Sequence, residues 1–275
     1  MNILCLGGSY TGRYVASKFS KEHQVSFLSR NAEELRAKGY TAAGPEGLQE
    51  LSKKGIGVIL DTVPAVHSKG GLEHPYRQEL EKVLEWNPGS AFIHVSSTSV
   101  YPMEFTAEDE KDLPTMDEGS PAKPDTERGA ERLLLEQHVA RLVPDLRVLR
   151  CGGIYGPGRC MAARFKYGDF RRAESGNRMI SRIHVHDLAR LILAVGAPNH
   201  DDGLRVVNAV DERSSTNRET FGFLGESLGI RVPGDWREAR PQGRRVVSLY
   251  AKGLLDGKFV YPTYREGFAQ CLAEE

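Results

Sequence analysis

The sequence predicts an α/β protein of the Rossmann type, with a doubly wound parallel sheet and a small C-terminal substrate lobe. Two observations lead to this fold class. Short apolar runs alternate with helical stretches over the first 156 residues, as in strands joined by crossover helices. The chain also opens with an apolar run (residues 2–6), a turn rich in glycine (7–12) and a helical stretch, the order that cradles the pyrophosphate of a dinucleotide.

Each predicted strand is a short apolar run that ends at a turn. In chain order, the predicted strands are Ile3–Leu6, Gln24–Leu28, Tyr40–Ala43, Gly57–Asp61, Ala91–Ser96 and Leu146–Cys151. The segments between them carry apolar residues at helical spacing, which predicts helices over Gly12–Lys21, Ala32–Lys38, Leu48–Lys53, Pro75–Trp86 and Asp125–Arg141. Right-handed crossovers would cover both faces of the sheet, with ligands beyond the carboxyl ends of the strands.

The alternation loosens after residue 156, where Gly and Arg become frequent. We expect residues 1–156 to form a dinucleotide-binding domain, to which a strand and a helix from residues 180–210 return. Residues 157–275 would form mainly a small substrate-binding lobe. In this part we expect helices over His186–Val195 and Asn217–Leu228, flanking a strand at Leu204–Asn208.

Composition narrows the class of partner. The 275 residues include 37 basic and 37 acidic ones, and this formal balance does not favour nucleic acid. No apolar run reaches the ~18 residues of a membrane span, and the first strand starts too early for a signal peptide. Four scattered cysteines without a Cys-x-x-Cys pair fit a reducing cytoplasm. We therefore expect a cytoplasmic protein that acts on a small molecule.

The turn after the first strand follows the pattern Gly-x-Gly-x-x-Gly, with Ser9 in the middle position. Such a turn is either an ordinary connection or a phosphate cradle. Its position inside a complete strand, turn and helix favours the cradle. The residues that we expect to hold the cofactor are Gly7, Ser9, Tyr10, Thr11, Gly12, Arg13, Ser29, Arg30, Thr62, Val63, Pro64, Ser96 and Gly153.

The end of the second predicted strand selects between the two dinucleotides. An acidic residue there would bind the ribose hydroxyls of NAD, whereas a basic one accommodates the additional phosphate of NADP. The chain has Ser29 and Arg30 at this place and no acid before Glu33. We therefore expect NADP(H) rather than NAD(H), with Arg13 as a second cation. The alternative is that both arginines are solvated surface residues.

Four segments resemble the extended short-chain dehydrogenase/reductase superfamily, which contains NAD(P)-dependent sugar epimerases and dehydratases. They are Gly7–Gly12, His94–Tyr101, Leu149–Pro157 and Arg182–Ala189. The resemblance implies a Rossmann domain and a small substrate lobe. The helix pairing of the family also implies a possible homodimer.

The resembled family carries a catalytic Tyr-x-x-x-Lys on the helix that follows the Ser/Thr strand. The corresponding stretch of this chain, residues 121–136, contains no tyrosine. If Glu136 takes the place of the family's helix glutamate, Arg128 falls at the tyrosine position and Arg132 at the lysine position. A guanidinium cannot act as a base. The chain thus resembles the atypical branch of the superfamily, which keeps the fold and lacks this pair.

Other groups remain for chemistry. Ser97 and Thr98 can hydrogen-bond a substrate carbonyl or hydroxyl, or else cap the loop that follows. Tyr101 either transfers a proton, with Arg128 or Arg132 lowering its pKa, or lines the pocket by packing. We take these five residues as the catalytic candidates.

Two charge clusters flank the predicted site. Residues 104–118 hold seven acids and one lysine, and residues 159–182 hold seven bases and two acids. Both clusters are either solvated surface or part of the site. For an anionic substrate the candidates are Tyr155, Arg159 and Arg182.

The segment from His184 to Asp187 places two histidines two residues apart, a spacing that would put them on one side of a strand. We expect no metal there, because no third ligand is evident, and because Asp187 suits the N-cap of the next helix.

These observations lead to one function and one alternative. We expect an NADP-dependent oxidoreductase or epimerase-like enzyme that acts on a small, polar, anionic carbonyl or hydroxyl compound. The alternative is a non-catalytic NADP(H)-binding sensor or regulatory protein, which the missing Tyr-Lys pair favours.

Overall fold

The computed structural model describes residues 1–64, 66–68, 71–143, 145–168, 177–198, 203–232 and 239–274. The chain divides into two compact units. The first comprises Met1–Ser97, Arg128–Arg150 and Ala189–Val207, and the second comprises Thr98–Glu127, Cys151–Leu188 and Asn208–Glu275. The return of residues 189–207 to the first unit lies within the predicted 180–210. Residues 98–127 and 151–156 lie in the second unit, although we expected them in the first.

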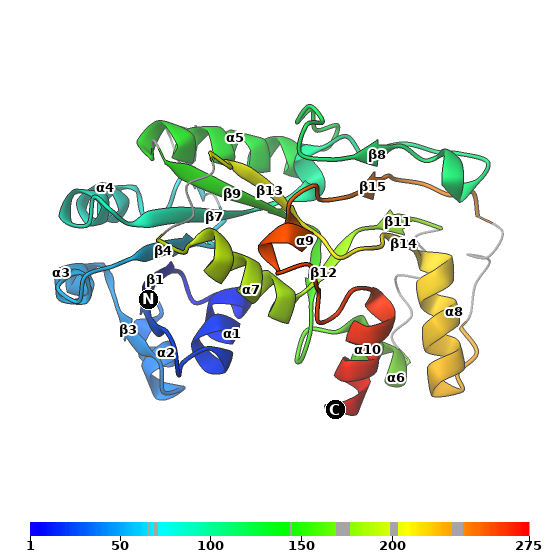
Figure 1. Cartoon of the computed structure of the whole chain (residues 1–275), viewed down its shortest axis with the longest axis horizontal. Helices are drawn as coiled ribbons and strands as arrows, with labels where there is room; N and C mark the ends of the chain where they lie inside the picture. The colour runs from blue at the N-terminus through cyan, green and yellow to red at the C-terminus, as the bar shows by residue number, and fades with distance from the viewer. Residues whose placement is uncertain are drawn as a thin grey trace. The chain divides into compact units, whose positions relative to one another are not determined.

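The described residues form a seven-stranded sheet in the order β13-β9-β7-β4-β1-β2-β3 (Figure 1). Its strands are β1 (Asn2–Leu6), β2 (Gln24–Leu28), β3 (Thr41–Ala43), β4 (Val58–Asp61), β7 (Ala91–Ser97), β9 (Leu146–Cys151) and β13 (Val206–Ala209). The pairs from β3 to β7 are parallel. Backbone bonds from Val148 to Arg205 and from Gly152 to Ala209 keep one sequence offset, so β9 and β13 are also parallel. The predicted parallel sheet is confirmed.

Helices cover both faces of this sheet. On one face, α3 (Leu48–Ser52), α4 (Arg77–Trp86) and α5 (Glu127–Leu142) bury leucines and valines against the strands. On the other face lie α1 (Tyr10–Lys18), α2 (Ala32–Ala37) and α7 (Val185–Val195) (Figure 1). A Cβ at Gly12 of α1 would approach Cys5 and Phe27 to 3.2 Å, so the absence of a side chain permits close packing of helix on sheet.

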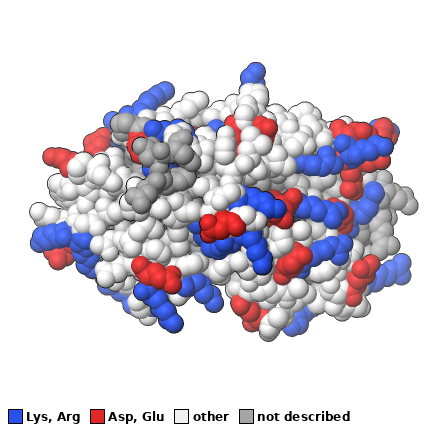
Figure 2. Space-filling model, viewed as in Figure 1, with Lys and Arg blue, Asp and Glu red and all other residues white. Residues whose placement is uncertain are grey.

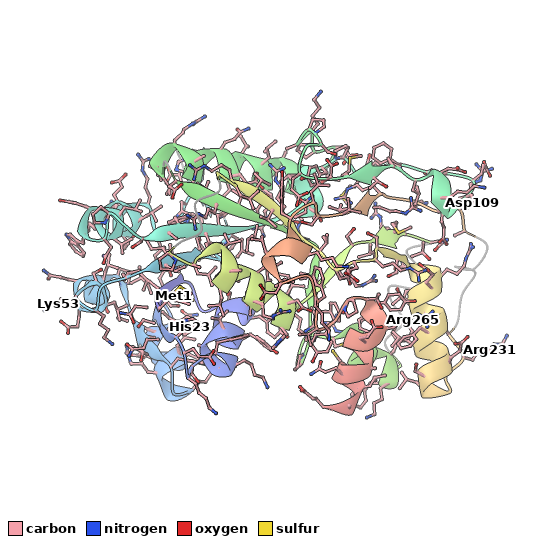
Figure 3. The ribbon with its side chains drawn as sticks, in the orientation of Figure 1. Met1, His23, Lys53, Asp109, Arg231 and Arg265 are labelled. Atoms are coloured by element: carbon pink, nitrogen blue, oxygen red, sulfur yellow. The ribbon has the colours of Figure 1, made fainter. Side chains whose placement is uncertain are left out.

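The N-terminus is attached to the first unit. The amino group of Met1 lies 3.1 Å from Nδ1 of His23, at the start of β2 (Figure 3). Burial and the neighbouring amino group lower the pKa of His23. This contact helps to set the register of β1 and β2. A hairpin of β5 (Val66–Ser68) and β6 (Gly71–Glu73), which the sequence did not indicate, follows β4.

The second unit is built from short strand pairs and helices. Its strands are β8 (Thr115–Met116), β10 (Gly153–Tyr155), β11 (Met179–Ile180), β12 (Arg182–His184), β14 (Ser215–Thr216) and β15 (Arg245–Val246). Its helices are α6 (Met161–Lys166), α8 (Asn217–Leu228), α9 (Ala251–Leu254) and α10 (Tyr264–Ala273). An aromatic core, which includes Phe165, Phe221 and Phe268, joins α6, α8 and α10. The helix predicted over residues 217–228 is confirmed.

Basic and acidic side chains are interspersed on the face shown in Figure 2, in keeping with the balanced composition. None of the helices in the described part of the chain has the length and apolar character that a membrane span requires.

Candidate functional site

The turn after β1 requires glycine at Gly7 and leads into a capped helix N-terminus. Gly7 adopts a φ of +78°, and a Cβ there would lie 2.6 Å from the side chain of Val63, so only glycine fits. Ser9 is the N-cap of α1, where its hydroxyl accepts the N–H of Gly12 at 3.0 Å. The cap leaves the hydroxyl proton of Ser9 available to a ligand, and the turn leads into a helix N-terminus with its positive dipole end.

The first turn of α1 holds three further predicted cofactor residues. Thr11 is buried, while Tyr10 and Arg13 are half-buried. Arg13 lies within electrostatic range of Glu34 and is not among the residues that line the cavity described next. Its expected role as a second phosphate-binding cation therefore gains no support from the cavity.

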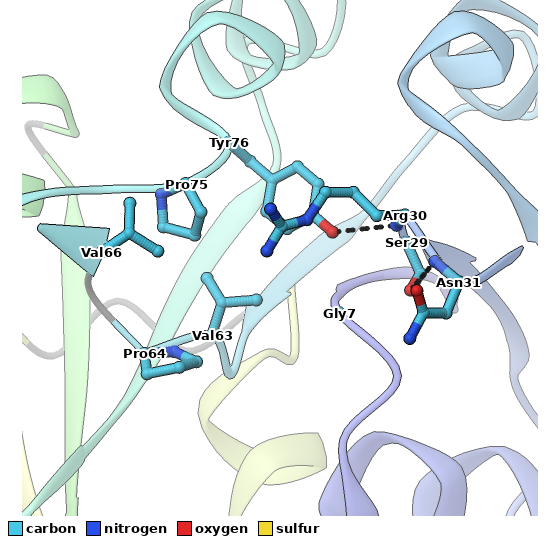
Figure 4. Close-up of a pocket in the computed structure, with 9 residues that line it drawn as sticks. All are labelled: Gly7, Ser29, Arg30, Asn31, Val63, Pro64, Val66, Pro75 and Tyr76. Carbon is cyan, nitrogen blue, oxygen red and sulfur yellow. Dashed lines mark hydrogen bonds between the residues drawn. The ribbon is translucent and has the colours of Figure 1, made fainter. Parts of the chain in front are cut away.

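A cavity of about 420 Å³ opens beside this turn in the first unit (Figure 4). Its lining residues are Gly7, Ser29, Arg30, Asn31, Val63, Pro64, Val66, Pro75 and Tyr76. The structure thus brings together five predicted cofactor residues from three separate parts of the sequence. Among the described lining residues none is acidic and one, Arg30, is basic.

Tyr76 is a wall of this cavity that sequence reasoning missed. Its hydroxyl accepts the backbone N–H of Arg30 at 3.2 Å, and Ser29 Oγ accepts the N–H of Asn31 at 3.1 Å. The Arg30 side chain is exposed and extends toward the Tyr76 ring (Figure 4). The sequence offered one signal for this role, an aromatic residue directly after Pro75. The predicted helix Pro75–Trp86 included both residues, but α4 begins only at Arg77.

A buried polar cluster fixes two walls of the cavity. Asp61 Oδ1 accepts the N–H of Val63 at 3.2 Å, and Oδ2 lies 2.7 Å from His94 Nδ1 and 3.1 Å from His74 Nε2. His74 Nδ1 in turn accepts the N–H of Tyr76 at 3.2 Å. Burial alone would raise the pKa of Asp61, but the two imidazoles outweigh it and hold this pKa well below its ordinary value. The carboxylate therefore holds Val63 directly and Tyr76 through His74.

Two other predicted cofactor residues use their hydroxyls within the protein. Thr62 Oγ1 donates to the carbonyl of Leu6 at 3.1 Å. Ser96 Oγ donates to Glu136 at 2.5 Å, and Glu136 forms a buried ion pair with Arg150 at 2.9 Å. These contacts tie strands and α5 together, so neither hydroxyl is placed primarily for a ligand.

The five catalytic candidates are divided between the units. Ser97 ends β7, and Arg128 and Arg132 lie in α5, with Arg128 exposed and Arg132 half-buried, all in the first unit. Thr98 and Tyr101 lie in the second unit, where Thr98 opens a short 3₁₀ turn.

Tyr101 has a clear packing role. Its side chain is fully buried, and its hydroxyl donates to Asn208 Oδ1 at 2.9 Å. Nδ2 of Asn208 in turn donates to the carbonyl of Val247 at 2.9 Å. Of the two roles weighed for Tyr101, this geometry favours packing over proton transfer.

Two residues of the predicted substrate-binding set, Tyr155 and Arg182, have partners within the second unit. Tyr155 lies in the aromatic core, its hydroxyl donates to the carbonyl of Thr263 at 3.4 Å, and burial raises its pKa far above the usual range. Arg182 is buried and donates to Ser215 Oγ at 2.6 Å. Both are core groups rather than groups that face a ligand. Arg159 is exposed in a turn closed on Gly156.

Gly153, the remaining cofactor candidate, lies in β10 of the second unit and donates its N–H to Ser181. Residues 169–176 of the predicted basic stretch lie outside the described residues.

The histidine segment has structural partners instead of a shared ligand. His184 Nε2 lies 3.2 Å from Gln270 Oε1, and burial lowers the pKa of His184 to about 4. His186 belongs to α7 and not to the strand, so the assumed spacing along a strand is wrong. Asp187 lies inside α7 and accepts the N–H groups of Val260 and Tyr261, so it is not the expected N-cap. Among the described residues no group of three acidic, His or Cys side chains is arranged to hold a metal ion.

Comparison with solved structures identifies the fold. Over 99% of this chain, a protein of unknown function from Silicibacter pomeroyi superimposes with a TM-score of 0.78 and 24% identity, covering 98% of that chain. A putative NAD-dependent epimerase/dehydratase from Methylobacillus flagellatus gives 0.74 and 22%, over 99% and 98% of the two chains. ADP-L-glycero-D-manno-heptose-6-epimerase from Helicobacter pylori gives 0.70 and 17%, over 99% and 95%.

No family model and no curated sequence matches the chain. The likeness to solved structures over nearly the whole chain confirms the predicted Rossmann-type fold.

Proposed function

We propose that this chain, which has the fold of the extended short-chain dehydrogenases/reductases, is an NADP-dependent oxidoreductase or epimerase-like enzyme. Its substrate would be a small, polar, anionic carbonyl or hydroxyl compound. The observation that carries the proposal is the cavity in which the Gly7 turn meets Ser29 and Arg30. Backbone amides suit a pyrophosphate, and a guanidinium suits a phosphate monoester.

The preference for NADP over NAD rests on the charge of the cavity. Recognition of the ribose hydroxyls of NAD ordinarily uses an acidic residue at the end of the second strand. The described cavity offers instead the exposed guanidinium of Arg30, with the hydroxyl of Ser29 beside it. A 2′-phosphate would meet a cation and a hydroxyl there.

The chain's own contribution to chemistry would be orientation. When bound, a nicotinamide supplies hydride transfer. Ser97 and Thr98 would hydrogen-bond the reacting oxygen, and Arg128 or Arg132 would stabilise negative charge on it. Tyr101 would support this segment through its bond to Asn208.

The alternative function is a sensor that binds NADP(H) without catalysis. The absence of a Tyr-x-x-x-Lys pair from residues 121–136 favours it. The two functions are separated by following NADPH oxidation with a panel of aldehydes, ketones and sugar nucleotides. We expect turnover with at least one anionic member. Saturable NADPH binding without oxidation by any member would favour the sensor.

Two further proposals concern the location of the protein in the cell and its oligomeric state. All four cysteines are buried and none forms a disulfide, which supports a reducing, cytoplasmic location. A homodimer formed by helix pairing is a second proposal, and sedimentation of the purified chain would test it.

A further inference from the structure

The buried polar cluster of the first unit joins three titratable side chains. Asp61 ends β4, His94 lies in β7, and His74 directly follows β6. His74 is 3% exposed and the other two residues are fully buried. Burying a carboxylate with two imidazoles costs desolvation, so such a cluster stabilises a fold little more than apolar side chains of the same volume would. It can instead fix the positions of its neighbours, and His74 leads from this cluster to the wall of the cofactor cavity.

His74 uses its two ring nitrogens for different purposes. Its Nδ1 accepts the backbone N–H of Tyr76 at 3.2 Å. A nitrogen that accepts a hydrogen bond carries no proton, so the proton of the neutral ring is on Nε2. That nitrogen lies 3.1 Å from Asp61 Oδ2, at ion-pair distance although not in line for a hydrogen bond. The carboxylate therefore favours the tautomer that leaves Nδ1 able to accept.

The backbone of Tyr76 depends on this acceptor. Tyr76 is buried directly before α4, and Pro75 has no N–H, so the first donor after His74 is the N–H of Tyr76. The carbonyl of His74 also accepts the N–H of Arg77 at 3.2 Å, and the carbonyl of Tyr76 accepts the N–H of Leu80 at 2.8 Å. The ring and the carbonyl of His74 thus hold the short turn that brings Tyr76 into the cavity wall.

We propose that His74 is a positioning residue for the cofactor, which it affects through Tyr76 and Arg30. The hydroxyl of Tyr76 accepts the N–H of Arg30 at 3.2 Å, so a series of contacts runs from the Asp61 carboxylate to the cation at the edge of the cavity. His74 itself is not among the described lining residues. The inference rests on the proposed function and names a residue that controls the cofactor site without touching the ligand.

The test separates the two nitrogens of His74. In His74→Asn the amide oxygen can take the place of Nδ1 and accept from Tyr76. In His74→Gln the amide reaches the place of Nε2 and leaves the N–H of Tyr76 without an acceptor. We expect NADPH to bind His74→Gln about fivefold or more weakly than wild type, and His74→Asn within about twofold, from the usual strength of one hydrogen bond. Calorimetric titration of the full chain measures both affinities, and thermal unfolding measures both stabilities.

A role confined to stability would lower the unfolding midpoint of both variants and leave their NADPH affinities equal, and that equality would overturn the inference. His23→Gln is the matched control. His23 is another histidine of the first unit, its Nδ1 contacts the amino group of Met1, and it is not among the described lining residues. This variant should bind NADPH as wild type does.

A double-mutant cycle tests whether His74 acts through Tyr76. In Tyr76→Phe the hydroxyl that contacts Arg30 is already absent. Adding His74→Gln to that variant should therefore weaken NADPH binding by less than about twofold, because the two changes interrupt one series of contacts. Losses that multiply in the double variant would show that His74 acts independently of Tyr76 and would contradict the proposed route.

Nitrogen NMR of the imidazole locates the proton of His74 without any cofactor, in the full chain near neutral pH. We expect a protonated Nε2 and an unprotonated Nδ1. A proton on Nδ1 would overturn the inference, even if neither His74 variant folds. Absence of NADPH binding by wild type would refute the proposed function, whereas wild-type binding with equal affinities of the two variants would refute the role of His74 alone.

Discussion

At the scale of single residues, Arg30 is the group on which we propose that cofactor choice depends. Its exposed guanidinium borders a cavity without a described acidic lining residue. Replacing Arg30 by Ala removes the only cation that the described lining offers to a 2′-phosphate. We expect NADP to bind roughly 10- to 100-fold more weakly, from the usual strength of charged hydrogen bonds, and NAD to bind almost unchanged.

The measurement is competition of NADP and NAD for the purified variant. Lys38→Ala is the matched control, because Lys38 is an exposed cation of the same unit that pairs with Glu34 outside the cavity. Equal losses of NADP and NAD in Arg30→Ala would show that Arg30 does not touch the additional phosphate.

We propose that Tyr76 affects cofactor binding through the backbone of Arg30. The variant Tyr76→Phe keeps the ring and removes the acceptor of the Arg30 N–H. We expect a loss of stability of about 1 kcal/mol, the usual value of one hydrogen bond, and a several-fold lower affinity for NADP because the Arg30 backbone is less well held. Thermal unfolding and NADPH titration of the same preparation measure the two effects. Unchanged NADPH affinity would remove Tyr76 from the site.

Tyr101 gives a prediction that separates packing from proton transfer. The change Tyr101→Phe leaves the buried Oδ1 of Asn208 without its donor. We expect a stability loss of about 1–3 kcal/mol with turnover lowered less than roughly tenfold. Urea unfolding and steady-state rates measure both. A turnover loss of about 10² with intact stability would instead assign proton transfer to Tyr101.

Residue types predict some of these roles and not others. The position of the Gly7 turn and of the Ser29–Arg30 pair beside one cavity was predictable, because glycine geometry and a strand-end cation are local features. The place of Tyr76 in the cavity wall was not predictable, since it depends on a contact with Arg30, which is distant in sequence. The burial of Arg182 against Ser215 was not predictable, because a basic stretch of sequence does not indicate which of its side chains is buried.

At the scale of elements, the structure at the end of β4 is stabilised by the carboxylate of Asp61, which becomes protonated in acid. The imidazoles of His94 and His74, acting against burial, hold the pKa of Asp61 below its ordinary value of 3.8. A carboxyl with a depressed folded pKa adds stability above its ordinary pKa and loses it as the pH falls below that value. We expect Asp61→Asn to be less stable than wild type near neutral pH.

The deficit of Asp61→Asn should shrink as the pH falls below about 4, where wild type loses the same contribution. Urea unfolding of both proteins between about pH 7 and about pH 3 measures it, at pH values where both still fold. A deficit that does not change over this range would contradict the assigned pairing. Glu50→Gln, which alters an exposed ion pair with Lys53, is the control for general acid effects.

Elements with strong local signals were predictable to the residue. The strands over 24–28 and 146–151 and the helix over 217–228 coincide with their predictions, because apolar runs and the capping box of Thr216 and Glu219 define their limits. The helix α10 carries a similar box at Thr263 and Glu266, a signal that we did not use. Two-residue strands such as β11 and β15 are too short to show periodicity, and they depend on long-range pairing.

At the scale of the whole molecule, the chain crosses between its two units several times. The turn after β7 leaves the first unit at Thr98 and α5 re-enters it at Arg128. The predicted single boundary at residue 156 therefore missed these crossings. The segment 98–127 contains only brief helices and strands, and its position depends on contacts within the second unit. The fold class was predictable because it follows from alternation over long stretches.

The central claim is that the Gly7 turn and the Ser29–Arg30 edge bind a nicotinamide dinucleotide, with NADP(H) preferred. The most direct measurement is calorimetric titration of the purified chain with NADPH and, separately, with NADH. The account predicts one saturable site per chain and tighter binding of NADPH, which Arg30→Ala removes selectively. Absence of binding by both dinucleotides would contradict the account.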